Sequence, residues 1–108
     1  TQERINLTTM SRKIYSEKLV AKYLLNVIKE ADGLIFKMHP ITNKGIPDYL
    51  VHCNGHTFYV ETKTTGKVCT EAQVFFHKML KEQGIETYVL DVPVHNLKEL
   101  QTLSYKTY

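Results

Sequence analysis

Residues 45–63 read GIPDYLVHCNGHTFYVETK, and this stretch predicts a β-hairpin with charged side chains at its open end. The Asn-Gly pair at 54–55 separates two runs rich in apolar and β-branched residues, a pattern most typical of a two-residue hairpin turn. Counting outward from this turn sets Asp48 opposite Glu61, and opposed side chains project from one face. Lys63 lies two residues beyond Glu61 and shares that face. The spacing therefore predicts two carboxylates and one ammonium group together.

The charges of this predicted cluster suit the binding of a divalent cation. Two opposed carboxylates repel each other, so the pair needs positive charge beside it. Lys63 supplies one such charge, and a divalent cation would supply two more. Sites of one or two carboxylates with open water positions suit Mg²⁺ or Mn²⁺. Such an ion activates water and neutralises a phosphate, while a lysine orients the water or stabilises the transition state. The hairpin therefore predicts metal-dependent hydrolysis of a phosphodiester.

The chain around the hairpin predicts an α/β domain with a mixed sheet of about four strands, flanked by helices. Apolar residues over 19–31 recur at three- and four-residue steps, so the first element should be a helix. We expect Ser11 or Ser16 to cap its start and the Asp-Gly pair at 32–33 to end it. The expected order is α-β-β-β-α-β-α, with strands at 33–39 (ended by Pro40), 48–53, 56–63 and 85–92 and later helices at 70–83 and 96–103.

The helix expected over 70–83 carries an apolar stripe of its own. Gly84 follows it at the position where helices commonly end in a left-handed residue. Thr70 and Gln73 have the spacing of a capping box, in which the glutamine reaches back to the amide of the first residue. The side chains expected to face inward are Ala72, Phe75, Phe76, Met79 and Leu80.

Composition sets the frame for these elements. The chain has 108 residues, 43% apolar and 23% charged, with a net charge of +3, and it predicts one domain over 1–108. Residues 1–10 are polar and without periodicity, so we expect a flexible arm there. No apolar run approaches the ~18 residues that span a bilayer, and the polar start does not resemble a signal peptide. Cys53 and Cys69 fit neither a disulfide framework nor a metal-binding knuckle. We therefore expect a cytoplasmic protein without a membrane partner.

The motifs of the hairpin resemble a known family. Gly-Ile-Pro-Asp at 45–48, Glu-Thr-Lys at 61–63 and Gln73 resemble the PD-(D/E)xK nuclease superfamily, and more narrowly its small stand-alone VRR-NUC branch from phages and bacteria. The resemblance covers roughly residues 16–92 and includes Glu17 on the first helix. It implies a restriction-endonuclease-like core and a metal-dependent DNA endonuclease. It also implies a homodimer that acts on branched DNA, such as four-way (Holliday) junctions, in the cytoplasm of a bacterium or a phage-infected host.

The same resemblance assigns roles to single residues. It implies that Asp48 and Glu61 bind Mg²⁺ or Mn²⁺ and that Lys63 is the catalytic lysine. The backbone of Thr62 is a further candidate ligand, and Glu17 is a candidate ligand through water. Glu17 and Gln73 are the supporting members of the catalytic set. The number of metal ions for each site is left open.

Each of these residues also has an ordinary structural explanation. Asp48, Glu61 and Lys63 are compatible with the solvated edge of a sheet, although the hairpin and the Pro-Asp motif favour the active site. Glu17 would interact favourably with the dipole of the first helix. Gln73 has its capping role, and we expect it not to serve both roles with the same amide atoms.

The histidines do not predict a zinc site. His52 and His56 are four residues apart, but they flank the hairpin turn and fall on opposite faces of the expected strands. His39 and His77 are isolated in the sequence, so we expect solvated or packing roles for them. The sequence contains no glycine-rich loop of the kind that binds a nucleotide cofactor.

Basic residues suggest where a nucleic acid would lie. Lys18, Lys22 and Lys29 share one face of the first helix, which suits either a phosphate backbone or a solvated helix face. Lys44 and Lys67 lie in loops expected to flank the catalytic end. The DNA-binding candidates are therefore Lys44, Lys67, Lys18 and Lys22.

The sequence thus favours a metal-dependent endodeoxyribonuclease that selects branched DNA by its shape. Two alternatives are kept open. One is a nuclease for flaps, nicks or less selective DNA substrates. The other is a nucleic-acid-binding module of the same fold that does not cut, against which the complete set of Asp48, Glu61 and Lys63 argues.

Overall fold

The structure, a computed structural model, describes residues 13–39 and 44–108. The expected arm over 1–10, the candidate cap Ser11 and the strand-ending Pro40 lie outside the described residues. The expected order of elements is confirmed. It runs α1 (Glu17–Glu30), β1 (Leu34–Lys37), β2 (Tyr49–Cys53), β3 (His56–Thr62), α2 (Glu71–Glu82), β4 (Glu86–Leu90) and α3 (Leu97–Leu103).

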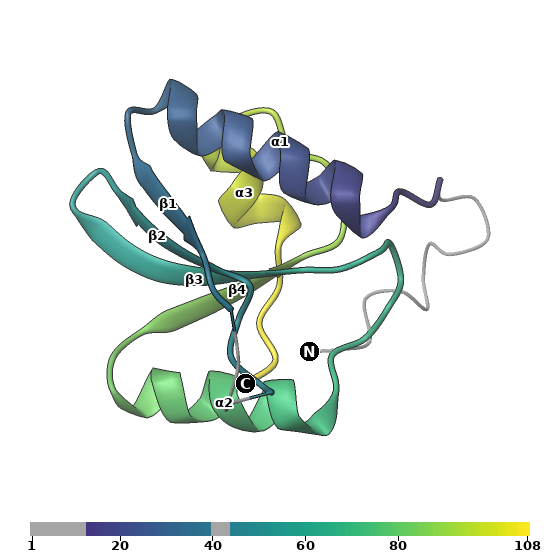
Figure 1. Cartoon of the computed structure of the whole chain (residues 1–108), viewed down its shortest axis with the longest axis vertical. Coiled ribbons are helices and arrows are strands. Elements are labelled where there is room, and N and C mark those ends of the chain that lie inside the picture. The colour runs from purple at the N-terminus through teal and green to yellow at the C-terminus, as the bar shows by residue number, and fades with distance from the viewer. Residues whose placement is uncertain (1–12, 40–43) are drawn as a thin grey trace.

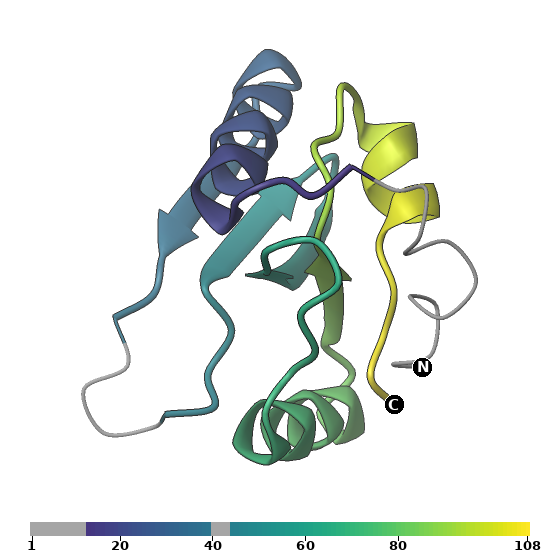
Figure 2. The same ribbon diagram turned by 90° about the vertical axis from the view of Figure 1, so that its right-hand side faces the viewer.

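The four strands form one mixed sheet in the order β1-β2-β3-β4. The first three strands pair antiparallel, and β3 and β4 pair parallel because α2 provides the crossover between them. Helices α1 and α3 cover one face of the sheet and α2 lies against the other (Figures 1 and 2). This layered α/β arrangement confirms the expected fold class.

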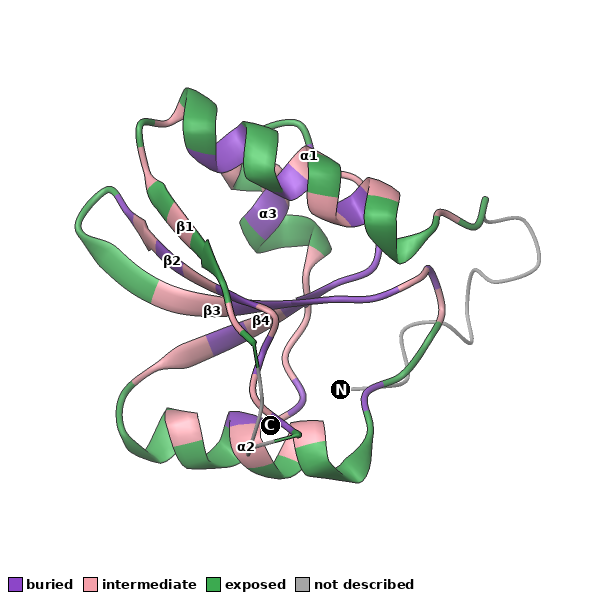
Figure 3. Ribbon diagram, viewed as in Figure 1, coloured by how far each residue is buried: buried purple, intermediate pink, exposed green. Residues whose placement is uncertain are grey.

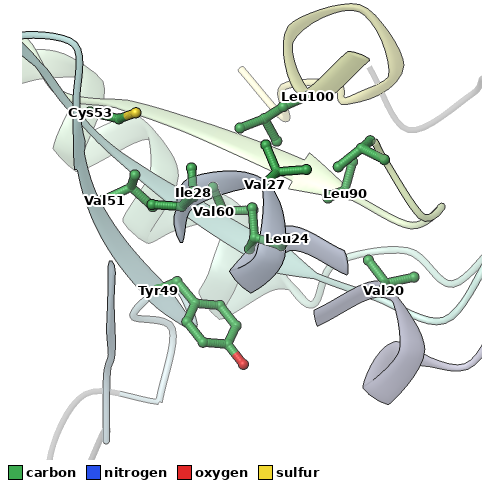
Figure 4. Packing of buried hydrophobic residues seen from close by; sticks show 11 residues of the cluster. Val20, Leu24, Val27, Ile28, Tyr49, Val51, Cys53, Val60, Leu90 and Leu100 are labelled. Carbon is green, nitrogen blue, oxygen red and sulfur yellow. The ribbon is translucent and has the colours of Figure 1, made fainter. Parts of the chain in front are cut away.

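The hydrophobic core lies between α1 and the sheet. Val20, Leu24 and Ile28 of α1 are fully buried, and they pack with strand residues such as Val51 and Val60 (Figure 4). Figure 3 shows the same pattern along the ribbons, with the buried positions of α1 turned toward the sheet. No helix among the described residues is both long and apolar enough to cross a bilayer. The core thus fixes the start of α1 beside the open end of the hairpin.

Helix α1 begins and ends where its local sequence directs. The Ser16 side chain accepts a hydrogen bond from the amide of Leu19, so Ser16 is the N-cap. At the other end Asp32 adopts a positive φ of 57°, and the helix gives way to β1. The expected start and stop are both confirmed at these positions.

The hairpin has the register that its turn predicts. Cys53 pairs with His56, and the pairing continues outward to Tyr49 and Val60. Asn54 and Gly55 both have positive φ values, 51° and 78°, as a type I′ turn requires. One residue beyond the pair of Tyr49 and Val60, this register sets Asp48 opposite Glu61.

The expected inward face of α2 is right at Phe76 and Leu80, which are partly buried, and wrong at the three exposed positions Ala72, Phe75 and Met79. Phe75 is 63% exposed and Met79 is 44% exposed, while His77 is fully buried. Gln73 and Leu80 are partly buried on the same side as His77. The helix presents a partly polar face to the sheet because the strand residues above it include buried charged groups that need polar partners. Periodicity of apolar residues alone therefore placed only part of the inward face correctly.

Gly45 explains how the loop before β2 approaches α2. A Cβ atom on this residue would lie 2.3 Å from the carbonyl oxygen of Ala72, a contact that no larger residue can make without moving backbone. The close approach brings the Gly-x-Pro-Asp segment against the first turn of α2. Asp48 and Gln73 are thereby placed at the same end of the molecule.

Candidate active site

The five residues singled out from the sequence gather at one end of the sheet. Asp48 directly precedes β2, Glu61 is in β3 and Lys63 directly follows β3. Glu17 is the first residue of α1, and Gln73 is in the first turn of α2. The start of a helix on each face of the sheet therefore approaches the open end of the hairpin.

Asp48 is held by its neighbour on β3. Its Oδ2 atom accepts hydrogen bonds from the amide nitrogen of Thr62 at 2.9 Å and from the Thr62 hydroxyl at 3.0 Å. One carboxylate oxygen is thus occupied and the side chain is fixed in orientation. The hydroxyl of Thr62 is a member of the site that sequence reasoning did not identify; its position between Glu61 and Lys63 was the available signal.

Glu61 is the most strongly perturbed group of the site. Its side chain is only 2% exposed, and its Oε2 atom accepts a hydrogen bond from Gln73 Nε2 at 3.2 Å. Burial raises the pKa of Glu61 to about 9, assisted by the negative charge of Asp48 and a hydrogen bond with it. The ionised form of Glu61 is therefore disfavoured at this position.

Gln73 serves the helix cap and the cluster at the same time. Its Oε1 atom accepts from the amide of Thr70 at 2.8 Å and from Lys63 Nζ at 2.8 Å. Its Nε2 atom donates to Glu61. The expectation that one amide would not serve both roles is wrong, because a carbonyl oxygen has two lone pairs and the NH₂ group is separate. Gln73 fixes Lys63, which is 8% exposed, relative to Glu61.

Glu17 belongs to the electrostatic surroundings of the cluster. Burial raises its pKa, and the charge of Asp48 acts in the same direction. The positive charges of Lys63, Lys67 and Lys37 act in the opposite direction. Its backbone amide donates to the Thr64 hydroxyl at 3.3 Å, which ties the start of α1 to the loop after β3. Glu17 therefore lies close enough to Asp48 for their negative charges to interact.

His77 is fully buried, as a packing role requires, and it also lies beside Glu61. Its Nε2 atom lies 3.6 Å from Glu61 Oε1, and both atoms are buried with no hydrogen-bond partner. Its Nδ1 atom lies 2.7 Å from the hydroxyl of Thr107. Burial lowers the pKa of His77 to about 4, so the ring is neutral. The available signal was its position one helical turn after Gln73 on α2.

A groove of about 800 Å³ leads along α1 to the cluster. Glu17 and Asp48 line the end of the groove that reaches the cluster. Its basic lining residues are Lys18, Lys22 and Lys29 of α1 and Lys37 of β1. Lys18 and Lys22 were expected near DNA, while Lys37 was not recognised from the sequence. Lys67 is near enough to lower the pKa of Glu17, and Lys44 is exposed but does not line the groove.

The site offers carboxylate oxygen atoms as donors for a metal ion. Within 13–39 and 44–108 no group of three or more His, Cys, Asp and Glu side chains is arranged to enclose a metal. The Nδ1 atom of His52 lies 2.7 Å from the hydroxyl of Thr57. Asp48 and Glu61 present hard carboxylate oxygen atoms, and Oε1 of Glu61 has no hydrogen-bond partner. These properties fit Mg²⁺ or Mn²⁺, which need few protein ligands because they retain water.

Cys53 and Cys69 are buried and form no disulfide. Burial raises the pKa of Cys69 to about 12, so its thiol remains protonated and is a poor nucleophile. Cysteine chemistry therefore does not compete with the carboxylates as an explanation of the site.

Comparison with known proteins identifies the fold. No family model matches the chain, and no curated protein is similar to it at a significant level. A solved structure described as a VRR_NUC domain superposes with a TM-score of 0.65 at 24% sequence identity, covering 82% of this chain and 95% of the other. The chain therefore has the fold of a VRR_NUC domain, as its hairpin motifs had suggested.

Proposed function

We propose that the protein is a metal-dependent endonuclease that hydrolyses phosphodiester bonds in DNA. The single observation that carries the proposal is the close pair of Asp48 and Glu61 beside the buried Lys63, at the end of a lysine-lined groove. A structural role alone would not require a buried carboxyl group with a pKa of about 9 next to a second carboxylate. The VRR-NUC fold supports this chemistry.

The residues of the cluster have separate tasks in this proposal. Asp48 and Glu61 would hold Mg²⁺ or Mn²⁺, with the Thr62 carbonyl and, through water, Glu17 as further ligands. When bound, the ion supplies Lewis acidity and lowers the pKa of an attacking water. Lys63 orients this water and stabilises the negative charge on the phosphate. The ammonium group of Lys63 donates a hydrogen bond of 2.8 Å to Oε1 of Gln73, and this bond fixes the direction of the Lys63 side chain.

The groove along α1 provides a path for the DNA strand. Lys18, Lys22, Lys29 and Lys37 line it, and its acidic end is the catalytic cluster. A phosphate backbone carries the complementary charge, and each lysine–phosphate contact releases bound counterions. Lys67 and Lys44 are further candidate contacts at the loops. We infer that the scissile strand lies along α1 with its cut phosphate at Asp48.

We further propose that the favoured substrate is branched DNA, such as a four-way junction, and that the active form is a homodimer. Resolving a junction requires two symmetric cuts, while one chain has a single cluster. A twofold dimer provides both sites through one self-complementary interface. No element of the described residues resembles a base-reading helix, so selection by DNA shape is consistent with this substrate.

The proposed function is tested with a panel of DNA substrates. Four-way junctions, flaps, nicked duplexes, plain duplexes and single strands are incubated with the protein in Mg²⁺, in Mn²⁺ and in chelator. We expect metal-dependent cleavage that is fastest on the junction. Equal cleavage of junction and plain duplex would contradict shape selection, and preference for flaps or nicks would support the alternative nuclease. Binding of DNA without cleavage in either metal would support the non-cutting module.

A further inference from the structure

We propose that His77 is a positioning residue for Glu61 and that the C-terminal tail, through Thr107, sets the orientation of His77. This inference rests on the proposed function, because it concerns how a metal-binding carboxylate is held. It assigns a role in the site to the last residues of the chain, which are remote from the motif residues in sequence.

The distances place His77 between two groups. Its ring is fully buried, with Nδ1 2.7 Å from Thr107 Oγ1 and Nε2 3.6 Å from Glu61 Oε1. Both Nε2 and Oε1 lack a hydrogen-bond partner. Leaving both polar atoms unpaired in the interior is unfavourable, because each has lost its hydrogen bonds to water. A movement of a few tenths of an ångström would pair them, since N–H···O bonds reach ~3.2 Å.

Only one arrangement of protons satisfies all three groups when Glu61 is ionised to bind a cation. A carboxylate can only accept, so Nε2 must carry the ring proton and donate it to Oε1. Nδ1 is then an acceptor, and the Thr107 hydroxyl donates to it. The second oxygen of Glu61 already accepts from Gln73 Nε2. Gln73 and His77, one turn apart on α2, would thus fix both oxygens of the carboxylate.

The tail is held in place independently of His77. Tyr105 pairs with Val89 through two backbone hydrogen bonds of 2.6 and 3.0 Å, which adds an antiparallel bridge to β4. Lys106 and Tyr108 both contact the side chain of Glu86. Figure 2 shows the tail descending from α3 past β4 toward α2. Thr107, between these anchors, is only 6% exposed.

Ligating groups that lose such a supporting hydrogen bond typically lose about 10- to 100-fold in metal affinity or activity. The test compares Thr107→Val, which keeps the shape but removes the hydroxyl, with Thr107→Ser, which keeps the hydroxyl. His77→Phe is paired in the same way with His77→Gln, whose amide nitrogen can donate at the position of Nε2. Tyr108→Phe, which removes another tail contact but leaves Thr107 in place, is the matched control.

Three quantities are measured for each variant: Mn²⁺ affinity by calorimetry without DNA, DNA affinity in chelator, and thermal stability. The tautomer of His77 is read from its ¹⁵N NMR shifts. We expect the Nε2-protonated ring in the Mn²⁺-bound wild type. We expect Thr107→Val and His77→Phe to weaken Mn²⁺ binding about 10-fold or more with unchanged DNA affinity. Thr107→Ser and His77→Gln should recover most of this loss, and Tyr108→Phe should not cause it.

The outcomes separate this inference from the proposed function. Three results would overturn the role of His77 and Thr107 and leave the proposed function standing. The first is a Thr107→Val variant that binds Mn²⁺ as tightly as the wild type, and the second is equal weakening of Mn²⁺ binding in Thr107→Ser and Thr107→Val. The third is a His77 ring protonated at Nδ1. Failure of the wild type to bind Mn²⁺ would overturn the proposed function together with this inference. Mn²⁺ binding that depends on Thr107, in a protein that cuts no DNA, would support the inference and contradict the nuclease.

Discussion

Glu61 illustrates how the fold alters the chemistry of a single residue. Its side chain is 2% exposed and lies beside Asp48, so its pKa rises from 4.5 to about 9. A carboxyl group in this state is destabilised as an anion and gains from any cation that replaces its proton. The raised pKa therefore indicates that a bound cation would stabilise the ionised form of Glu61. It also indicates that the free energy of unfolding depends on pH.

The first prediction concerns that pH dependence in the absence of metal. Between pH 4.5 and about 9 the folded protein keeps the Glu61 proton while the unfolded chain loses it. The free energy of unfolding should therefore fall as pH rises, by up to about 1.4 kcal/mol per unit from this group. His77, with its pKa lowered from 6.5 to about 4, acts in the opposite direction only below pH 6.5.

Urea unfolding in chelator at pH 7 and pH 8.5 measures this effect. Glu61→Gln is the control, since its amide cannot titrate and should flatten the profile. Addition of Mn²⁺ should restore stability to the wild type at the higher pH. A wild-type profile as flat as that of Glu61→Gln would contradict the raised pKa.

The second prediction separates the two roles of Gln73. Thr70→Ala removes the hydroxyl that caps α2 at 3.2 Å but leaves the backbone amide that donates to Gln73. It should cost about 1 kcal/mol of stability and leave cleavage almost unchanged. Gln73→Ala also releases Lys63 and Glu61, so its cleavage rate should fall about 10-fold or more. Equal cleavage by both variants, measured at a temperature where both are folded, would reduce Gln73 to a helix cap.

At the scale of elements, local signals predicted most of what was found. The Asn54-Gly55 turn predicts the register of the hairpin because a two-residue turn leaves no freedom in pairing. The caps at Ser16 and Thr70 are likewise local, and both were predicted. The inward face of α2 was predicted only in part, because the buried Glu61 needs polar partners on this helix and the apolar stripe does not supply them.

The third prediction concerns the groove between α1 and β1. Each of three variants should bind DNA more weakly: Lys22→Ala, Lys29→Ala and Lys37→Ala. The slope of log affinity against log salt concentration should also become shallower, by the amount that corresponds to about one lost phosphate contact. Lys98→Ala, an exposed lysine of α3 that does not line the groove, is the matched control. Fluorescence anisotropy at several salt concentrations measures both quantities. Equal effects from Lys98 and the groove lysines would show that only net charge matters.

The contacts that could not be predicted from the sequence are those between segments that lie far apart along the chain. The pairing of Tyr105 with Val89 and the position of Thr107 beside His77 depend on how the tail returns along β4. No periodicity or turn motif in the chain encodes this return. The same is true of Lys37, which joins the groove only because β1 pairs with β2.

The fourth prediction concerns the whole molecule. Phe75 and Met79 of α2 are 63% and 44% exposed, an unusual position for large apolar side chains. We expect a second copy of the chain to cover them in the proposed homodimer. Sedimentation velocity should give twice the 12.5 kDa mass of one chain, and Phe75→Glu should give monomers. A monomeric wild type at micromolar concentration would contradict the dimer, and a dimeric Phe75→Glu would move its interface elsewhere.

The central claim is that Asp48, Glu61 and Lys63 form a metal-dependent hydrolytic site. Its most direct test is the single-turnover cleavage of a labelled four-way junction by the wild type, Asp48→Asn and Lys63→Ala, with junction affinity measured in parallel. We predict wild-type cleavage in Mg²⁺ or Mn²⁺ that stops in chelator. Both variants should lose about 100-fold or more in rate while they bind the junction with nearly wild-type affinity. Cleavage that persists in chelator, or an active Lys63→Ala, would contradict the account.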